Sequence, residues 1–287
     1  MAELILGTAS FSVGYGVSRA NLNLDCKAAM EILQTARALG IKGFDTAPAY
    51  GRSEEILGDT LGLDEEFVVS TKIGFDACQD VEKLNSSVRR SLTLLKVPQI
   101  DTLYIHDERS LLSDKSEALI DNLEELRKEG IFRKLGASVY TLTSILEIQR
   151  KFPSVEVFQV PENICDRRLR ECGELLELSE CEYKFVVRSV FLQGLLLMRP
   201  EQIPSKLKEA TSAVESLSLF AKKHTISVLD LCLAYAQSIP WCDKILIGAA
   251  SPLQLREISE SQCKLPDTWQ KEVIRVPDEL VDPRKWS

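Results

Sequence analysis

The sequence predicts a (β/α)8 TIM barrel, an α/β fold in which eight parallel strands close into a ring inside a layer of helices. Short apolar runs rich in β-branched residues alternate with longer segments of helical period along the chain. About eight such strand–helix pairs fit into 287 residues, the usual size of this barrel. No low-complexity linker interrupts the alternation, so we expect a single domain over residues 1–287.

The strands are expected where the apolar runs are short and end in polar residues. Most of their positions are apolar, as is typical of strands that are buried on both faces of a parallel sheet. The predicted strands are Leu4–Leu6, Ile41–Asp45, Phe67–Lys72, Thr102–His106, Leu135–Ser138, Val155–Val160, Phe185–Val190 and Lys244–Ile247.

The helices are expected between these strands, where apolar residues recur every three or four positions. Gly40 and Gly130 follow two of them as helix-ending residues. The predicted helices are Lys27–Leu39, Ser53–Leu61, Val81–Leu95, Lys115–Glu129, Leu142–Lys151, Leu169–Leu178, Ser205–His224, Val228–Gln237 and Leu253–Ser259.

An open, doubly wound sheet would also alternate strands and helices. Such a sheet usually carries a glycine-rich phosphate loop between an early strand and its helix. Gly14-Tyr15-Gly16 lacks the third glycine of that motif and does not lead from a strand directly into a helix. The closed barrel is therefore the better interpretation.

Composition limits the class of protein. Hydrophobic residues make up 45% and charged residues 27%, as in soluble globular proteins. A net charge of -8 argues against nucleic acid as the main partner. No apolar run is long enough to span a membrane, and the N-terminus lacks the pattern of a signal peptide. Eight scattered cysteines and two histidines show no metal-ligand spacing. We expect a cytoplasmic monomer or small homo-oligomer with reduced cysteines and no bound metal.

Catalytic side chains of such a barrel lie at the carboxyl ends of its strands. Asp45 ends the second predicted strand and Tyr50 follows it, Lys72 closes the third, and His106 closes the fourth. Each residue alone has an ordinary structural explanation, such as a turn cap or a packing ring. Together they form a plausible general acid, because a lysine that is held by a carboxylate can lower the pKa of a nearby phenol. With no redox metal indicated, the hydride would come from a cofactor.

Seven segments carry a resemblance that extends over nearly the whole chain. They are GFDTAPAYGRSEEILG (43–58), VVSTKIG (68–74), DTLYIHD (101–107), KLGASVY (134–140), FQVPENICDRR (158–168), RSVFLQGLLL (188–197) and ILIGAASPLQLRE (245–257). In these segments the chain resembles the aldo-keto reductase superfamily. The resemblance implies NAD(P)H-dependent reduction of an aldehyde or ketone. Tyr50 would be the proton donor, Lys72 and Asp45 would tune its pKa, and His106 would orient the carbonyl.

The resemblance also implies a set of cofactor contacts. Gly7 and Thr8 would lie on the nicotinamide side, Ser138 and Gln159 would hold the carboxamide, and Arg188 would replace an aromatic ring that stacks on the nicotinamide. Ser189, Leu192 and Gly194 match the loop around the pyrophosphate. Gly248, Ser251, Gln254, Arg256 and Glu257 follow the last strand, where relatives bind the adenosine part.

Departures from the family pattern bear on the cofactor and the substrate. Val139 stands where many relatives have asparagine, and Gln254 stands where an arginine often binds the 2′-phosphate. The resemblance implies NADPH as the cofactor, and these departures leave NADH open as well. Few residues follow the last predicted helix. This short tail suggests an open pocket that would suit a polar or sugar-like carbonyl.

Two other functions remain open at this stage. The barrel could bind the cofactor as a redox-sensing or regulatory protein with little turnover. It could instead be a lyase or isomerase of phosphorylated metabolites, whose phosphate would bind after the seventh and eighth strands, where Gly194 and Gly248 lie.

Overall fold

The computed structural model describes residues 2–12, 16–17, 24–62 and 66–286, so Gly14 and Tyr15 of the glycine pair lie outside the described residues. Eight parallel strands pair in chain order, and β8 pairs back with β1 to close the barrel. The strands are β1 (Glu3–Gly7), β2 (Gly43–Asp45), β3 (Val68–Ile73), β4 (Ile100–Ile105), β5 (Phe132–Ser138), β6 (Val155–Pro161), β7 (Lys184–Arg188) and β8 (Lys244–Gly248). The predicted (β/α)8 barrel is thus confirmed.

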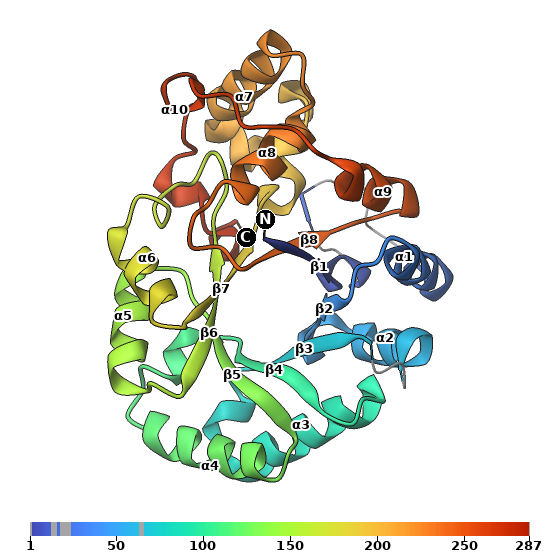
Figure 1. Ribbon diagram of the computed structural model, residues 1–287, viewed down its shortest axis with the longest axis vertical. Helices are drawn as coiled ribbons and strands as arrows, with labels where there is room; N and C mark the ends of the chain where they lie inside the picture. Colours follow the sequence, from blue (N-terminus) through green and yellow to red (C-terminus); the bar gives the residue numbers. More distant parts are fainter. Residues whose placement is uncertain (1, 13–15, 18–23, 63–65, 287) are drawn as a thin grey trace.

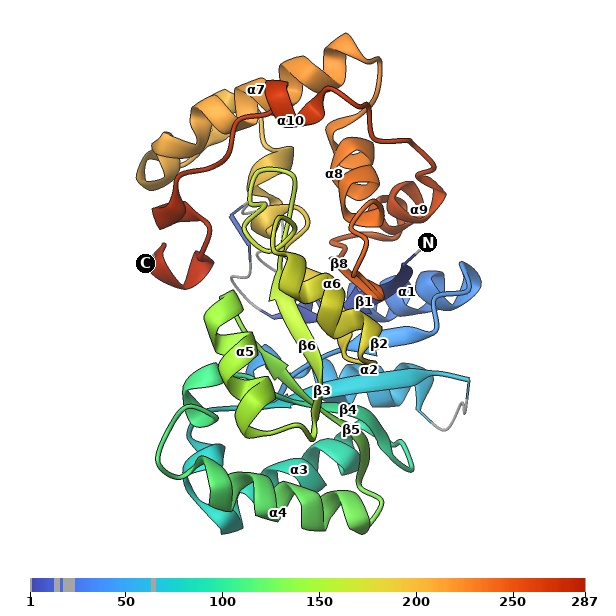
Figure 2. The same ribbon diagram turned by 60° about the vertical axis from the view of Figure 1, so that its left-hand side comes forward.

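The helices follow one another around the outside of the strands (Figure 1). In Figure 2, α7 and α8 lie at one end of the molecule and α3 and α4 at the other. The α-helices are α1 (Cys26–Ala38), α2 (Ser53–Leu61), α3 (Val81–Leu95), α4 (Ser116–Lys128), α5 (Leu142–Lys151), α6 (Gly173–Glu180), α7 (Thr211–Lys223), α8 (Val228–Gln237), α9 (Pro252–Glu260) and α10 (Trp269–Glu272).

Three predicted elements need correction. The helix expected over Leu169–Leu178 begins only at Gly173, because Cys172 before it has an extended backbone with φ -87° and ψ 115°. The helix expected over Ser205–His224 is a 3₁₀ segment, Ser205–Ala210, followed by α7. The strand expected over Phe185–Val190 ends at Arg188, because Ser189 has a left-handed φ of 62°.

Side chains fill the inside of the barrel. Ile5, Tyr104, Val157 and Val186 form a small buried cluster there, separate from the main core between strands and helices. Tyr104 pairs in register with Gly136 of the next strand, and a Cβ at position 136 would lie 2.5 Å from the tyrosine ring. Glycine at this position therefore makes room for an aromatic ring at the barrel centre.

Candidate active site

A cavity of about 490 Å³ opens at the carboxyl ends of the strands, within the usual size range of small-molecule sites. Asp45, Tyr50, Lys72 and His106 all line it. They come from β2, the 3₁₀ turn Pro48–Tyr50, β3 and the residue after β4. The structure therefore brings the four predicted catalytic side chains together.

Lys72 and Asp45 form a buried ion pair. Their side chains are each 2% exposed, and Nζ of Lys72 donates to Oδ1 of Asp45. Nζ also donates to the carbonyl of Thr46 at 3.0 Å, and Nε2 of Gln159 donates to Oδ2 of Asp45 at 2.8 Å. Both charges are thus paired and hydrogen-bonded, as buried charges must be.

Tyr50 lies between this ion pair and His106. The Tyr50 and His106 rings meet edge to face with centroids 6.0 Å apart, and Nζ of Lys72 is 5.4 Å from the centroid of the Tyr50 ring. The hydroxyl of Ser53 donates to the carbonyl of Tyr50 at 2.7 Å, which fixes the turn where α2 begins. The phenol is therefore held beside a cation and an imidazole.

Burial dominates the proton equilibria of the site. It raises the pKa of Tyr50, which Asp45 raises further and Arg188 lowers. The expectation that the phenol has a lowered pKa is therefore wrong for this structure, since desolvation of the phenolate outweighs the nearby cations. Burial also lowers the pKa of Lys72 and, together with the charge of Lys72, lowers the pKa of His106 to about 4. Near neutral pH the phenol is protonated and the imidazole is neutral.

Two buried residues next to this group were not predicted. Glu54 is 3% exposed and its Oε1 accepts a hydrogen bond from Thr71 at 2.6 Å, next to Lys72 in sequence. Tyr104 is 2% exposed, and its ring centroid lies 5.7 Å from Nζ of Lys72. The helical period of α2 could have placed Glu54 on the inner face, because Leu57 and Leu61 follow on the same side.

The loop after β7 carries an unusual run of backbone conformations. Ser189, Leu192, Gln193 and Gly194 all have positive φ, at 62°, 46°, 53° and 89°. Arg188, Ser189 and Gly194 line the cavity, whereas Leu192 is buried and does not line it. Left-handed turns of this kind can present successive backbone N–H groups to an anion.

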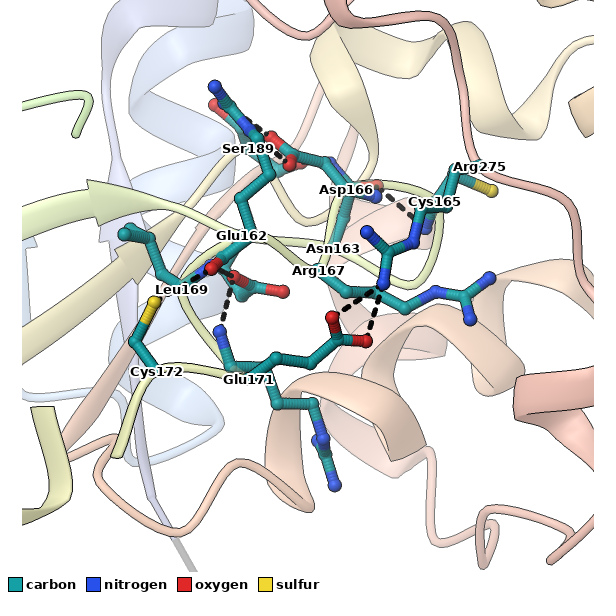
Figure 3. A network of polar contacts seen from close by, with 12 residues as sticks. Glu162, Asn163, Cys165, Asp166, Arg167, Leu169, Glu171, Cys172, Ser189 and Arg275 are labelled. Carbon is teal, nitrogen blue, oxygen red and sulfur yellow. Dashed lines mark hydrogen bonds and ion pairs between the residues drawn. The ribbon is translucent and has the colours of Figure 1, made fainter. Parts of the chain in front are cut away.

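A polar network in the segment that follows β6 supports the loop after β7 (Figure 3). Nδ2 of Asn163 donates to the carbonyl of Ser189 at 3.2 Å, and Oδ1 of Asn163 accepts from the backbone N–H groups of Cys165 and Asp166. Arg167 donates to the carbonyl of Val273 in the C-terminal segment. The loop after β6 thus connects the rim of the cavity to the residue that follows α10.

The loop after β8 forms the other end of the cavity. Gly248 and Gln254 line it, while the hydroxyl of Ser251 accepts from the backbone N–H of Gln254 as the N-cap of α9. Arg256 and Glu257 are exposed on α9 and do not line the cavity. Oε1 of Gln254 accepts from the N–H of Ala250 at 2.7 Å. No lysine or arginine of the described chain lines this end.

The remaining predicted contacts lie between these two ends. Gly7, Ser138 and Gln159 line the cavity. Thr8 does not line it, and its hydroxyl donates to the carbonyl of Asp45 at 3.2 Å. Ser138 and Gln159 are paired in register between β5 and β6.

The C-terminal tail forms part of the cavity wall, which the sequence did not indicate. Pro283 and Arg284 line the cavity together with Tyr140, and the Arg284 guanidinium carbon lies 3.5 Å from the centroid of the Tyr140 ring. Nε1 of Trp286 donates to the carbonyl of Leu280 at 3.1 Å, and Nζ of Lys206 donates to the carbonyl of Trp286 at 2.5 Å, which ties the tail to the segment before α7. Two residues of the tail therefore line the cavity, and the expectation of an open pocket stays a prediction.

The residues that the structure describes hold neither a membrane-spanning helix nor a metal site. No helix there is both long and apolar enough to cross a membrane. The same residues contain no cluster of three or more histidine, cysteine or acidic side chains arranged to hold a metal ion.

Comparison with known proteins places this geometry in a family. The model of the Aldo/keto reductase family matches residues 3–272. The chain is 30% identical to the "Uncharacterized oxidoreductase YqkF" of Bacillus subtilis, with 90% of each chain covered. It is 28% identical to L-galactose dehydrogenase of Arabidopsis thaliana, over 86% of this chain and 82% of the relative.

Solved structures agree on the fold. The aldo-keto reductase AKR11C1 from Bacillus halodurans superposes with a TM-score of 0.76 at 23% identity, covering 98% of this chain and 95% of the other. The glycerol dehydrogenase AKR11B4 from Gluconobacter oxydans gives a TM-score of 0.72 at 23% identity, covering 97% and 90%. The chain belongs to the aldo/keto reductase family and is an oxidoreductase.

Proposed function

We propose that this protein is an NAD(P)H-dependent reductase of aldehydes or ketones in which Tyr50 donates the proton. The observation that carries the proposal is the convergence of Tyr50, His106 and the buried Lys72–Asp45 pair on one cavity. Names of relatives such as L-galactose dehydrogenase and D-threo-aldose 1-dehydrogenase support a polar, sugar-like carbonyl as substrate.

The cavity suits a nicotinamide dinucleotide in shape and chemistry. Its lining runs from Asp45, Tyr50, Lys72 and His106 to the loops after β7 and β8, and Ser189 and Gly194 of the first loop would lie beside the pyrophosphate. Ser138 and Gln159 would hold the carboxamide, and Nε2 of Gln159 also donates to Asp45. Arg188 would lie against the nicotinamide ring.

The end of the cavity that would bind the adenosine decides between NADPH and NADH, because only NADPH carries a 2′-phosphate. Ser251 caps α9 by accepting from the backbone N–H of Gln254, and Arg256 lies on the exposed face of the helix. Because no cation of the described chain lines that end of the cavity, an ionic grip on a 2′-phosphate has no evident source there. We therefore propose that the protein accepts NADPH and NADH with similar affinity.

The chain's own residues then account for the proton transfer. A reduced nicotinamide supplies the hydride when it is bound. His106, neutral because its pKa is about 4, can donate one N–H to the substrate carbonyl and orient it. Tyr50 is protonated at neutral pH and can deliver its proton to the carbonyl oxygen. Lys72 stabilises the phenolate that remains, and Asp45 keeps the lysine charged and in place.

The replacement Tyr50→Phe tests this assignment. It removes the proton donor but keeps the ring, so we expect kcat to fall by about 10²- to 10⁴-fold while the affinity for NADPH stays within about twofold. Tyr183→Phe is a matched control, because Tyr183 lies outside the cavity and contacts Gln149. Oxidation of NADPH with a panel of aldehydes and sugars provides the assay. Near-normal reduction by Tyr50→Phe would show that another group donates the proton.

The two alternative functions make different predictions in the same assay. A redox-sensing or regulatory barrel would bind the cofactor but turn over none of the carbonyl panel. A lyase or isomerase of phosphorylated metabolites would bind neither NADPH nor NADH, and its phosphate would bind near Gly194 and Gly248.

A further inference from the structure

Two buried polar residues, Glu162 and Asn163, begin the segment after β6 (residues 162–172). Both are 0% exposed, and neither lines the cavity. Polar side chains that are fully buried persist in a protein where hydrogen bonds satisfy them. The groups that these two residues hold therefore indicate what they do.

Glu162 organises the segment after β6 itself. Its carboxylate accepts hydrogen bonds from the backbone N–H groups of Leu169 and Arg170 and from the hydroxyl of Tyr235. Its own backbone N–H donates to the carbonyl of Arg188 at 3.1 Å, which extends the pairing between β6 and β7. The side chain of Glu162 thus closes the segment, and its backbone joins the segment to the end of β7.

Asn163 reaches from the same segment to the next residue of the neighbouring chain (Figure 3). Its Oδ1 accepts from the backbone N–H groups of Cys165 and Asp166, each at 3.0 Å, and its backbone N–H donates to the carbonyl of Asp166 at 3.0 Å. These bonds fix the side chain in a tight turn of the kind that asparagine favours. Its Nδ2 then donates to the carbonyl of Ser189 at 3.2 Å.

Ser189 has a backbone conformation that needs such support. Its φ of 62° lies in the left-handed region, which is less stable for a residue with a Cβ than for glycine. Successive carbonyls of an extended strand point to opposite sides, but those of Arg188 and Ser189 both accept from the segment after β6. The carbonyl of Ser189 also accepts from the N–H of Leu192 at 2.8 Å. The hydrogen bond from Asn163 therefore stabilises the turn by which the chain leaves β7.

This turn sets the course of the loop after β7. Near the other end of the loop, the carbonyl of Gln193 accepts from the backbone N–H of Val17 at 3.1 Å. The loop is thus held at its start by Asn163 and near its end by Val17. Between these two points Ser189, Gln193 and Gly194 line the cavity at the proposed cofactor site.

We propose that Asn163 is a positioning residue for the cofactor, which keeps the loop after β7 in the shape that binds the dinucleotide by holding the carbonyl of Ser189. This inference rests on the proposed NAD(P)H-dependent function. Without the hydrogen bond, the strained turn at Ser189 relaxes in the free protein, and cofactor binding has to restore it. The apparent dissociation constant then rises in inverse proportion to the fraction of protein that is still competent to bind.

The replacement Asn163→Ser tests this role without adding a charge. A serine hydroxyl can still accept from the N–H groups of Cys165 and Asp166, but it ends one atom short of Nδ2 and loses the contact with Ser189. NADPH is titrated with the purified full chain while nicotinamide fluorescence is followed. We expect the Kd to rise about 3- to 10-fold, the factor that corresponds to one neutral hydrogen bond. An unchanged Kd would overturn the proposal.

A second variant serves if Asn163→Ser does not fold. Asn163→Asp keeps the size of the side chain and the accepting Oδ1, but an ionised carboxylate has no donor for the carbonyl of Ser189. The Kd for NADPH should again rise about 3- to 10-fold. Unchanged binding by this variant would count against the proposal in the same way.

Two controls separate the contact with Ser189 from a general loosening of the protein. Asn122→Ser is the matched control, since Nδ2 of Asn122 also donates to a backbone carbonyl, that of Ala118 at 2.6 Å, but on α4 and outside the cavity. Tyr235→Phe removes a hydrogen bond to Glu162 in the same network. Both variants should keep the Kd for NADPH within about twofold, and Tyr235→Phe should lower the free energy of unfolding. A rise in Kd for Tyr235→Phe as large as that for Asn163→Ser would overturn the proposal.

A double-mutant cycle with Ser189→Gly tests the route by which Asn163 acts. Glycine takes a positive φ without the penalty that serine pays, so the turn needs less support. We expect Asn163→Ser to raise the Kd by less than about threefold in the Ser189→Gly background. An equal rise in both backgrounds would show that Asn163 does not act through the backbone of Ser189.

Steady-state kinetics distinguishes this role from catalysis. Asn163→Ser should raise the KM for NADPH about 3- to 10-fold and leave kcat and the KM for the carbonyl within about twofold. If the unmodified protein binds NADPH but reduces no carbonyl, the reductase function fails, and the Kd values still decide the role of Asn163. If it reduces carbonyls and the Asn163 variants bind NADPH normally, the role of Asn163 fails alone. If it binds neither NADPH nor NADH, both proposals fail.

Discussion

Replacing Lys72 with methionine removes the cation of the buried ion pair and leaves Asp45 without its charge partner. Asp45 is 1% exposed. After the replacement, its carboxylate would keep the hydrogen bond from Nε2 of Gln159 but no cation. Removing one member of a buried pair costs about 3–5 kcal/mol, because the other charge stays desolvated. Methionine has nearly the length of lysine, so packing at this position should change little.

A double-mutant cycle separates this loss of charge pairing from other effects. The partner variant is Asp45→Asn, which keeps the shape of the carboxylate but not its charge. We expect Lys72→Met to lower the free energy of unfolding by about 3–5 kcal/mol and the double variant to recover about 2 kcal/mol of this. Urea unfolding followed by circular dichroism measures each free energy. Additive losses in the double variant would refute the view that Lys72 and Asp45 act as an ion pair. Lys72→Met should also abolish most carbonyl reduction.

Two further predictions concern packing and pH. Gly58→Ala should lower the free energy of unfolding in urea by about 1–3 kcal/mol, since the new Cβ would meet the backbone carbonyl of Leu94 in α3. Gly173→Ala is the control, because a Cβ at position 173 meets no atom within 4 Å, and its effect should be neutral or slightly stabilising. Burial lowers the pKa of His106 to about 4, against about 6.5 in the unfolded chain, so the unfolded state takes up the proton first. The free energy of unfolding should therefore fall by about 3 kcal/mol as the pH drops from about 6.5 to about 4. Comparison with His106→Gln between pH 7 and 4 isolates that contribution, and equal pH dependence of the two proteins would contradict the lowered pKa.

The barrel and the convergence of the four candidate side chains could be predicted because both follow from local patterns. Short apolar runs define parallel strands, and parallel strands place their carboxyl ends on one rim. Asp45, Lys72 and His106 each stand at or next to such an end, so their convergence needed no knowledge of packing. Even the strand ends that were placed wrongly, such as that of β7, differ by only a few residues.

Other features depend on contacts between distant parts of the chain. The helix over Leu169–Leu178 looked regular in sequence, but Glu162 holds Leu169 and Arg170 in a separate turn, and the extended backbone of Cys172 delays the helix to Gly173. Arg284 reaches Tyr140 across more than half of the sequence, and no local pattern in the tail indicates that contact. The direction of the Tyr50 pKa was misjudged for a related reason. The nearby charges could be read from the motif, but the extent of burial could not.

Binding of reduced nicotinamide cofactors tests the central claim most directly. Purified protein is titrated into NADPH and, separately, into NADH, while the fluorescence of the reduced nicotinamide is followed. The proposed site predicts saturable binding of both, with dissociation constants within about tenfold of each other because no described cation lines the adenosine end of the cavity. If neither NADPH nor NADH binds saturably, the reductase assignment is contradicted and the phosphate-binding alternative is favoured.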